Sequence, residues 1–233
     1  MTSVRKPDPF SVIADERIAA VLRRLYKEAN RQHFSVVRHL SRQAWSFLRS
    51  KAVEFPMAEM GGFWGDKYIA IVEPQGAFCY LTARALRARI VVEFGTSFGI
   101  STLWLAAAVK ANGGGTVITT EIVPEKAAMA RRNFDEAGVA DMIDLRVGDA
   151  LDSLRDDPAD IDFLLNDGFP MLALDIVKLL APRMRSGAVV LTDDVGGLAG
   201  NFRDYVAWLR DPANGFESTL LPLKGGSEYS VRR

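Results

Sequence analysis

The sequence contains only one cysteine and two histidines among its 233 residues. A lone cysteine, Cys79, cannot form an internal disulfide and suits a reducing compartment. Both histidines, His33 and His39, fall in one stretch with helical periodicity, where a histidine is more often packed or solvated than a ligand. We therefore expect no disulfide-stabilised domain, and we place neither histidine in the functional site.

Net charge and long apolar runs are also absent. Lys plus Arg and Asp plus Glu each number 29, so no overall field attracts nucleic acid or an anionic membrane. No segment approaches the roughly 18 consecutive apolar residues of a membrane span, and the N-terminus has no apolar signal core. We expect a soluble, cytoplasmic protein without nucleic-acid or membrane partners.

Hydrophobic residues make up 48% of the sequence, enough for the core of one α/β domain. The clearest signal is the segment 91–102, VVEFGTSFGIST, in which a strand leads through a Gly-rich turn into an apolar helix. Gly95 and Gly99 permit a sharp turn and close approach of a ligand, and the first N–H groups of the helix face the same place. The pattern favours a nucleotide-like cofactor; the alternative is a tight turn without a ligand.

The middle glycine of the dinucleotide fingerprint G-x-G-x-x-G is missing, because Ser97 stands where a pyrophosphate needs bare backbone. A nicotinamide-dependent oxidoreductase is therefore disfavoured. The segment instead resembles the first motif of class I S-adenosylmethionine-dependent methyltransferases, with Glu93 as the strand-end acid. This resemblance implies that the loop wraps the methionine part of S-adenosylmethionine and that Ser101, at the helix start, meets its carboxylate.

Acids also end the next two expected strands. Because neighbouring parallel strands end at one crevice, we expect Glu121 beside Gly95, where its carboxylate accepts both ribose hydroxyls. A cap for the helix that begins at Pro124 is the alternative. The family resemblance implies that Asp149 accepts from the adenine amine and that Ala150 lies against the ring; Asp149 could instead cap the short helix 150–154.

Three aspartates follow the apolar strands 161–166 and 187–192, and converging carboxylates suit a hard divalent cation. The segments DFLLND and SGAVVLTDD resemble the small cation-dependent O-methyltransferases of the catechol and caffeoyl-coenzyme A type, in their bacterial branch. The resemblance implies that Mg²⁺ or another divalent cation is held by Asp167, Asp193 and Asp194, the last standing where Asn is usual. It also makes Asp167 the candidate catalytic residue.

The lysine that is the proposed base of that group has no counterpart here, because Asp167 is followed by Gly-Phe-Pro. Deprotonation of the acceptor then depends on the metal, on one of the clustered aspartates, or on a loop group such as Lys67 or Tyr68.

The resemblance implies a doubly wound, Rossmann-like α/β fold with a seven-stranded sheet of order 3-2-1-4-5-7-6, the last strand antiparallel. Residues 15–49 read as two helices, and the loop 57–68 either closes over the pocket or is pinned to the core by Phe63 and Trp64. We expect 1–70 to supply N-terminal helices and a lid loop for the acceptor site, and 71–233 to form the cofactor-binding core of one structural domain. A homodimer paired through the N-terminal helices stays open.

These features predict an S-adenosylmethionine-dependent O-methyltransferase that methylates a hydroxyl of a small molecule or saccharide, assisted by a divalent metal. The alternatives are a metal-independent enzyme with an Asp or His base and a cofactor-binding protein without turnover. The candidate cofactor-binding residues are Glu93, Gly95, Thr96, Ser97, Ser101, Glu121, Ile122, Asp149, Ala150 and Asp167.

Overall fold

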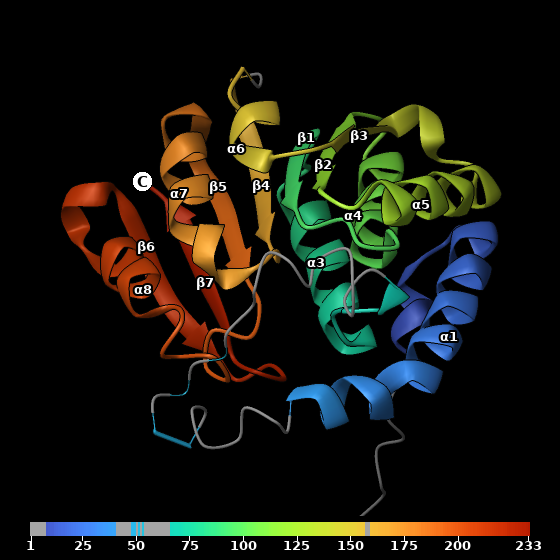
Figure 1. The fold of residues 1–233 in the computed structure, drawn as a ribbon. Coiled ribbons are helices and arrows are strands. Elements are labelled where there is room, and N and C mark those ends of the chain that lie inside the picture. The colour runs from blue at the N-terminus through green and yellow to red at the C-terminus, as the bar shows by residue number, and fades with distance from the viewer. Residues whose placement is uncertain (1–7, 41–47, 50, 52, 54–65, 157–158) are drawn as a thin grey trace, which may run out of the picture.

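A seven-stranded sheet forms the centre of the computed structural model, which describes residues 8–40, 48, 49, 51, 53, 66–156 and 159–233 (Figure 1). The strand order is β3-β2-β1-β4-β5-β7-β6. Strands β1 to β5 pair in parallel, and β7 pairs antiparallel with both β5 and β6. The expected doubly wound fold, with its strand order and antiparallel last strand, is confirmed.

The strands are β1 (Ile90–Phe94), β2 (Thr116–Glu121), β3 (Ile143–Val147), β4 (Ile161–Asn166), β5 (Met184–Thr192), β6 (Phe216–Leu221) and β7 (Ser227–Arg232). The α-helices are α1 (Glu16–Leu40), α3 (Glu73–Ala85), α4 (Ile100–Ala111), α5 (Pro124–Ala137), α6 (Ala150–Ser153), α7 (Ala173–Leu180) and α8 (Arg203–Arg210). Short 3-10 turns lie at Pro9–Val12, Ala140–Met142, Pro170–Leu172, Ala181–Arg183 and Pro212–Asn214.

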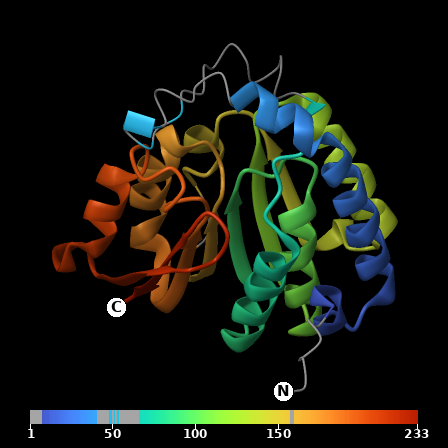
Figure 2. The ribbon, with the colours of Figure 1, turned by 90° about the horizontal axis from the view of Figure 1, so that it is seen from below.

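Helices cover both faces of the sheet (Figure 2). Alternate strand residues point to opposite faces, so Val91 packs in one buried cluster with α1, α3, α4 and α5, while Val92 packs in a second cluster with α7 and α8. Strands buried on both faces are mostly apolar, and in β4, with the sequence IDFLLN, the polar residues Asp162 and Asn166 lie near its two ends. The polar side chains that could contact a ligand are therefore confined to the strand ends.

Local signals explain the helix boundaries. Helix α5 starts with Pro124 at its first turn and ends at Gly138, whose φ of 69° is the left-handed conformation of a helix C-terminus. Helix α4 is buried on nearly all sides, and its Trp104 donates a hydrogen bond from Nε1 to the Tyr26 hydroxyl over 3.1 Å. This contact fixes α1 against the core.

The N-terminal region is described in part. Helix α1 runs without a break from Glu16 to Leu40, whereas the sequence reading placed two helices within 15–49; residues 41–47 lie outside the described residues. Most of the expected lid loop, 57–65 with Phe63 and Trp64, also lies outside them. None of the helices in the described part of the chain combines the length and apolar character needed to cross a bilayer.

Candidate functional site

The sheet register brings the expected site residues to one edge. Phe94 of β1 is level with Thr120 of β2 and with Asn166 of β4, and Asn166 is level with Thr192 of β5. Parallel strands in this register end together, so the residue after each of these four lies on the same rim. These next residues are Gly95, Glu121, Asp167 and Asp193.

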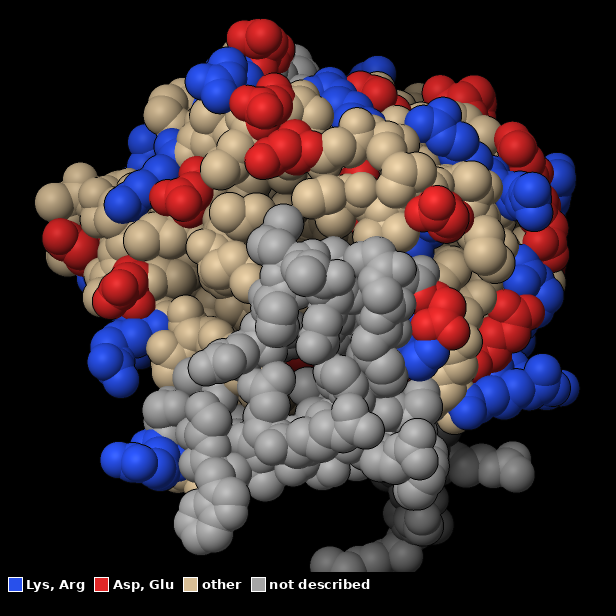
Figure 3. Space-filling model, viewed as in Figure 1, with Lys and Arg blue, Asp and Glu red and all other residues tan. Residues whose placement is uncertain are grey.

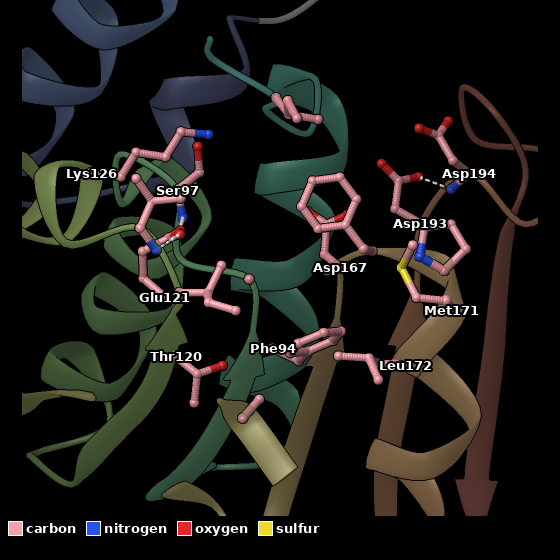
Figure 4. Close-up of a pocket in the computed structure, with 18 of the residues that line it drawn as sticks. Phe94, Ser97, Thr120, Glu121, Lys126, Asp167, Met171, Leu172, Asp193 and Asp194 are labelled. Atoms are coloured by element: carbon pink, nitrogen blue, oxygen red, sulfur yellow. Dashed lines mark hydrogen bonds between the residues drawn. The ribbon is translucent and has the colours of Figure 1, made fainter. Parts of the chain in front are cut away.

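A cavity of about 470 Å³ opens along this rim. Figure 4 shows Ser97, Glu121 and Lys126 at one end of it, Asp193 and Asp194 at the other, and Asp167 between them. The expected site residues that line it are Gly95, Ser97, Glu121, Ile122, Asp149, Ala150, Asp167, Asp193 and Asp194. The two groups of acids predicted from the sequence thus face one continuous space.

The Gly-rich loop has a shape that only particular residues tolerate. Gly95 has a φ of +103°, and a Cβ there would lie 2.8 Å from the backbone oxygen of Asp167. Ser97 also has a positive φ, 49°, and its N–H donates to Oε2 of Glu121 over 2.7 Å. The loop is therefore held against both neighbouring strands, which leaves its backbone open to the cavity.

Glu121 is a buried carboxylate at the cavity wall, 8% exposed. Its Oε1 accepts from the N–H of Val123, the residue before α5, over 2.8 Å, and no side-chain hydrogen bond caps the helix itself. Burial raises the pKa of Glu121, while the hydrogen bonds from Val123 and Ser97 and the charge of Lys126 lower it. Each oxygen has one backbone donor and can accept a second hydrogen bond from a ligand hydroxyl.

Three other candidates stand behind the loop and do not line the cavity. Glu93 is fully buried and accepts hydrogen bonds of 2.5 Å from the Thr102 and Thr119 hydroxyls, while its Oε1 has no hydrogen-bond partner in the part of the chain that the structure describes. The Thr96 hydroxyl pairs with Thr119 over 2.6 Å, and Ser101 is 6% exposed at the start of α4. These side chains support the loop from the side of the sheet.

Asp149 and Ala150 follow β3 and line the cavity. The Asp149 carboxylate accepts from the Leu151 N–H over 2.8 Å and so caps α6, while the residue also lines the cavity. Ile122, 42% exposed, lines it as well. One oxygen of Asp149 caps the helix and the other can accept a hydrogen bond from a ligand, so the two expected roles of this residue are compatible.

Asp193 is the most firmly positioned of the three clustered aspartates. Its Oδ1 accepts from Gln75 Nε2 over 2.6 Å, from the Asp194 N–H over 2.7 Å and from the Ser227 hydroxyl over 3.4 Å. With one oxygen held by these donors, the other is the one available to a ligand.

The three clustered aspartates lie near a single lysine and form no ion pair in the described part of the chain. This exposed lysine, Lys224, lies near enough to lower the pKa of Asp193 and Asp194. Burial and the charges of the other two raise the pKa of Asp167 well above its usual value, and burial with the Asp193 charge raises that of Asp194 to about 6.

The fit to a divalent cation is one of chemistry and charge. Three carboxylates are the donor set that a hard cation prefers. The described residues contain no group of three or more His, Cys, Asp or Glu side chains close enough together to hold a metal ion.

Figure 3 shows that acidic and basic side chains are interspersed on one outer face of the molecule.

The two loop groups considered as bases do not line the cavity. Lys67 pairs with Asp66, and the Tyr68 hydroxyl donates to Oε2 of Glu28 over 2.8 Å. The Tyr68 ring stacks on Phe98, with ring centroids 4.1 Å apart. Tyr68 thus braces the Gly-rich loop from outside.

The sequence reading missed much of the cavity wall. Lys126 lies in the first turn of α5, five residues after Glu121, and the short segment after Asp167 supplies an apolar surface. The missed lining residues are Val53, Ile69, Phe94, Thr120, Val123, Lys126, Gly148, Gly168, Phe169, Pro170, Met171, Leu172, Gly197, Leu198 and Phe202. Only the position of the 168–172 segment, next to a strand-end acid, could have signalled part of this set.

The N-terminal part of the chain reaches this wall at Val53. Asn201 accepts from the Val53 N–H over 2.8 Å through Oδ1 and donates to the Val53 carbonyl over 2.9 Å through Nδ2. Gly200 donates from its N–H to the Lys51 carbonyl over 3.1 Å. Three hydrogen bonds therefore fasten this piece of chain beside the acids.

Known proteins resemble this chain in sequence. A model of the methyltransferase domain matches residues 92–195. The chain is 39% identical over 142 residues to the catechol O-methyltransferase of Mycobacterium tuberculosis, covering 58% of this chain and 63% of that protein. A second catechol O-methyltransferase, from Niastella koreensis, is 39% identical over 90 residues, 39% of this chain and 40% of that protein. The chain thus spans less than two thirds of either relative.

A longer match and two solved structures extend the comparison. A Mycolicibacterium smegmatis protein named "Putative O-methyltransferase" is 32% identical over 180 residues, 70% of this chain and 83% of that protein. The O-methyltransferase of Bacillus cereus in complex with SAH superposes with a TM-score of 0.66 at 26% identity, covering 76% of this chain and 88% of that one. The O-methyltransferase TomG of Streptomyces achromogenes, in complex with SAM, superposes with a TM-score of 0.64 at 27% identity, covering 77% of this chain and 91% of that one. The chain belongs to the family of S-adenosylmethionine-dependent O-methyltransferases.

Proposed function

We propose that this protein transfers a methyl group from S-adenosylmethionine to a hydroxyl of a small molecule. The observation that supports this most strongly is the single cavity that joins the Ser97 and Glu121 end to the Asp167, Asp193 and Asp194 end. A donor held at the first end would present its methyl to an acceptor held at the second. Both SAM and SAH occur in structures of relatives with this fold.

In the proposed complex the cofactor lies along the strand ends. Glu121 accepts from the ribose hydroxyls, Asp149 from the adenine amine, and the ring rests against Ala150 and Ile122. The loop from Gly95 to Ser101 wraps the methionine part, with Glu93 and Thr96 supporting it from behind. Methyl transfer from a sulfonium is an in-line displacement, so the main task of these residues is to hold donor and acceptor in line.

We further propose that Mg²⁺ or another divalent cation assists, held by Asp167, Asp193 and Asp194. When bound, such a cation lowers the pKa of an acceptor hydroxyl and neutralises developing charge. The three clustered carboxylates support this role, and the hydrogen bonds from Gln75 and Ser227 fix the orientation of Asp193 beforehand.

A metal-independent reaction is the second candidate, and a specific observation favours it. The described residues contain no group of three or more His, Cys, Asp or Glu side chains close enough together to hold a metal ion, and the pKa of Asp194 is about 6, which suits a general base near neutral pH. In this case Asp194 or its neighbour Asp193 removes the acceptor proton directly, and added metal has no effect on the rate.

The acceptor is proposed to be a planar hydroxylated aromatic molecule, because the wall beside the acids is apolar. Phe169, Pro170, Met171 and Leu198 line this part of the cavity, which suits a ring more than a saccharide. Two relatives are named catechol O-methyltransferases. Residues 1–70 are proposed to complete the acceptor site, since Val53 and Ile69 already line it.

We propose that the enzyme works in the cytoplasm. The buried thiol of Cys79 suits the reducing cytoplasm. Two subunits could pair through α1, and analytical ultracentrifugation would distinguish this dimer from a monomer by its mass.

The test is turnover with a defined panel. The protein is incubated with S-adenosylmethionine and either catechols, single phenols or saccharides, with Mg²⁺ or with EDTA, and products are identified by mass spectrometry. A catechol that gains one methyl, with an equal amount of SAH formed, is the expected result. Equal rates with Mg²⁺ and EDTA would support the metal-independent reaction. Binding of S-adenosylmethionine without any methylated product across the panel would favour a cofactor-binding protein without turnover.

A further inference from the structure

Lys126 is a buried cation at the cofactor end of the cavity. It lies in the first turn of α5, is 5% exposed, and lines the cavity. In the described part of the chain its ammonium makes no hydrogen bond or ion pair; it lies over the Phe98 ring, 5.4 Å from the centroid. An ammonium buried without a hydrogen-bond acceptor destabilises a folded protein, so folding alone does not explain this residue.

A second unsatisfied polar group lies at the same end. The hydroxyl of Ser97 is buried and has no hydrogen-bond partner among the described residues, although the backbone N–H of this residue is bonded to Glu121. Figure 4 shows Lys126, Ser97 and Glu121 at the same end of the cavity. Two side chains from separate elements, the Gly-rich loop and α5, therefore leave hydrogen bonds unmade at this end of the cavity. Such groups are matched by a bound ligand.

The surrounding charges indicate what kind of ligand group fits. Glu121 and Asp66 lie close enough to Lys126 to raise its pKa against the lowering effect of burial, yet Glu121 is too far for an ion pair. An anion at this point would be repelled by both carboxylates. A neutral hydroxyl would instead donate a hydrogen bond to Glu121 and accept one from Lys126, so that both charged groups have a hydrogen-bond partner.

We propose that Lys126 is a cofactor-binding residue that donates a hydrogen bond to the ribose diol of S-adenosylmethionine, opposite the acceptor Glu121. The inference rests on the cofactor site proposed above and adds a donor to it. A diol held between a cation and a carboxylate is fixed in orientation as well as in place, because each oxygen has one partner that accepts and one that donates. The methionine carboxylate, in contrast, belongs to the loop side of the site.

The experiment compares ligands that share the ribose and differ elsewhere. Calorimetry measures SAH, 5′-methylthioadenosine, which lacks the amino acid part, and 2′,3′-dideoxy-5′-methylthioadenosine, which lacks the diol. The variants are Lys126→Met, which removes the ammonium at similar length, and Lys126→Arg, which keeps a cation. Lys178→Met, an exposed lysine of α7 away from the cavity, is the matched control.

We expect Lys126→Met to weaken both SAH and 5′-methylthioadenosine by about 10-fold or more, as for loss of a hydrogen bond to a charged group. The dideoxy ligand should bind the variant as weakly as it binds the wild type. Lys126→Arg should restore part of the affinity, and Lys178→Met should change none. The melting temperature of the ligand-free Lys126→Met protein should stay equal or rise, because an unpartnered buried charge is gone.

Other results would overturn the inference. If Lys126→Met weakened SAH alone, the ammonium would belong to the methionine carboxylate; if it weakened neither ligand, or lowered the ligand-free melting temperature in step with affinity, Lys126 would be structural. Failure of the wild type itself to bind SAH is a different outcome, because that would refute the proposed cofactor site and not only this residue.

Discussion

Gln75 holds Asp193 from inside the protein. Its side chain is 1% exposed in the first turn of α3, and its amide donates to Oδ1 of Asp193 over 2.6 Å and to the Ser227 hydroxyl over 2.8 Å. A helix from one cluster of the core thus fixes the orientation of a carboxylate at the end of β5. The relationship links the packing of α3 to the acid end of the cavity.

Replacing Gln75 by Met should lower turnover and leave cofactor affinity unchanged. The variant keeps the side-chain volume but removes the donor to Asp193, which is worth about 1.5–3 kcal/mol for a hydrogen bond to a charged group, or at least about 10-fold in rate. The kcat from a methyl-transfer assay and the Kd of SAH from calorimetry measure the two effects. Ser227→Ala, which removes the longer 3.4 Å contact, should cost less. Equal losses in kcat and in SAH affinity would mean that Gln75 acts on the whole fold.

The acid cluster should make stability depend on pH in a defined direction. The pKa of Asp194 is raised from 3.8 to about 6, so the folded state binds more protons than the unfolded chain between these values. The free energy of unfolding should therefore increase as pH falls from about 6 toward 4. Urea unfolding of the ligand-free protein across this range measures it, and Asp194→Asn should flatten the profile. A profile that falls over the same range would contradict the assigned shift.

Divalent cations should reverse the pH dependence of stability that the three clustered aspartates cause. Because a cation requires ionised carboxylates, stabilisation by Mg²⁺ should grow as pH rises through about 6, the pKa of Asp194. Thermal melts with Mg²⁺ and with EDTA at pH 5 and at pH 8 test this, with Asp167→Asn as the variant that loses the response. If the melting temperatures with Mg²⁺ and with EDTA were equal at both pH values, the metal-independent reaction would be favoured.

Gly95→Ala should abolish cofactor binding. The new Cβ would lie 2.8 Å from the Asp167 carbonyl oxygen, and the φ of +103° is unfavourable for alanine. Gly113→Ala is a matched control, since Gly113 has a φ of +92° but no atom within 4 Å of the new Cβ. Both variants should lose about 1–3 kcal/mol of stability from backbone strain, while only Gly95→Ala loses SAH binding. The result that would argue against a cofactor loop is loss of SAH binding in both variants, or in neither.

Asn201→Ala should raise the KM for the acceptor and leave the affinity for SAH unchanged. The variant removes both hydrogen bonds that fasten Val53 to the wall beside the acids. Asn214→Ala, which removes one hydrogen bond to the Trp208 carbonyl away from the cavity, is its control. An unchanged acceptor KM would count against the proposed role of residues 1–70 in the acceptor site.

The sequence predicted the elements whose ends carry their own signals. Glu121 ends β2 and Pro124 begins α5, as expected, because a carboxylate marks the strand end and a proline suits the first helical position. The order of the sheet was implied by the resemblance to the methyltransferase family, and the structure has this order. The register that brings Glu121 and Asp167 to one rim follows from parallel pairing.

What the sequence did not predict depends on contacts between distant segments. Lys126 is a candidate because it is buried at the cavity wall over the Phe98 ring, and the periodicity of α5 does not mark it. The burial of Glu93 behind the loop likewise follows from its hydroxyl partners on α4 and β2. Gln75 reaches Asp193 across 118 positions of sequence, a separation that no local pattern encodes.

Calorimetric titration of the wild-type protein with SAH tests the central claim most directly. Binding of one SAH per chain, lost in Glu121→Ala and competed by 5′-methylthioadenosine, is the predicted result. No heat of binding in a correctly folded wild-type sample, with no methylated product from the acceptor panel, would contradict the assignment of this cavity to a methyl donor.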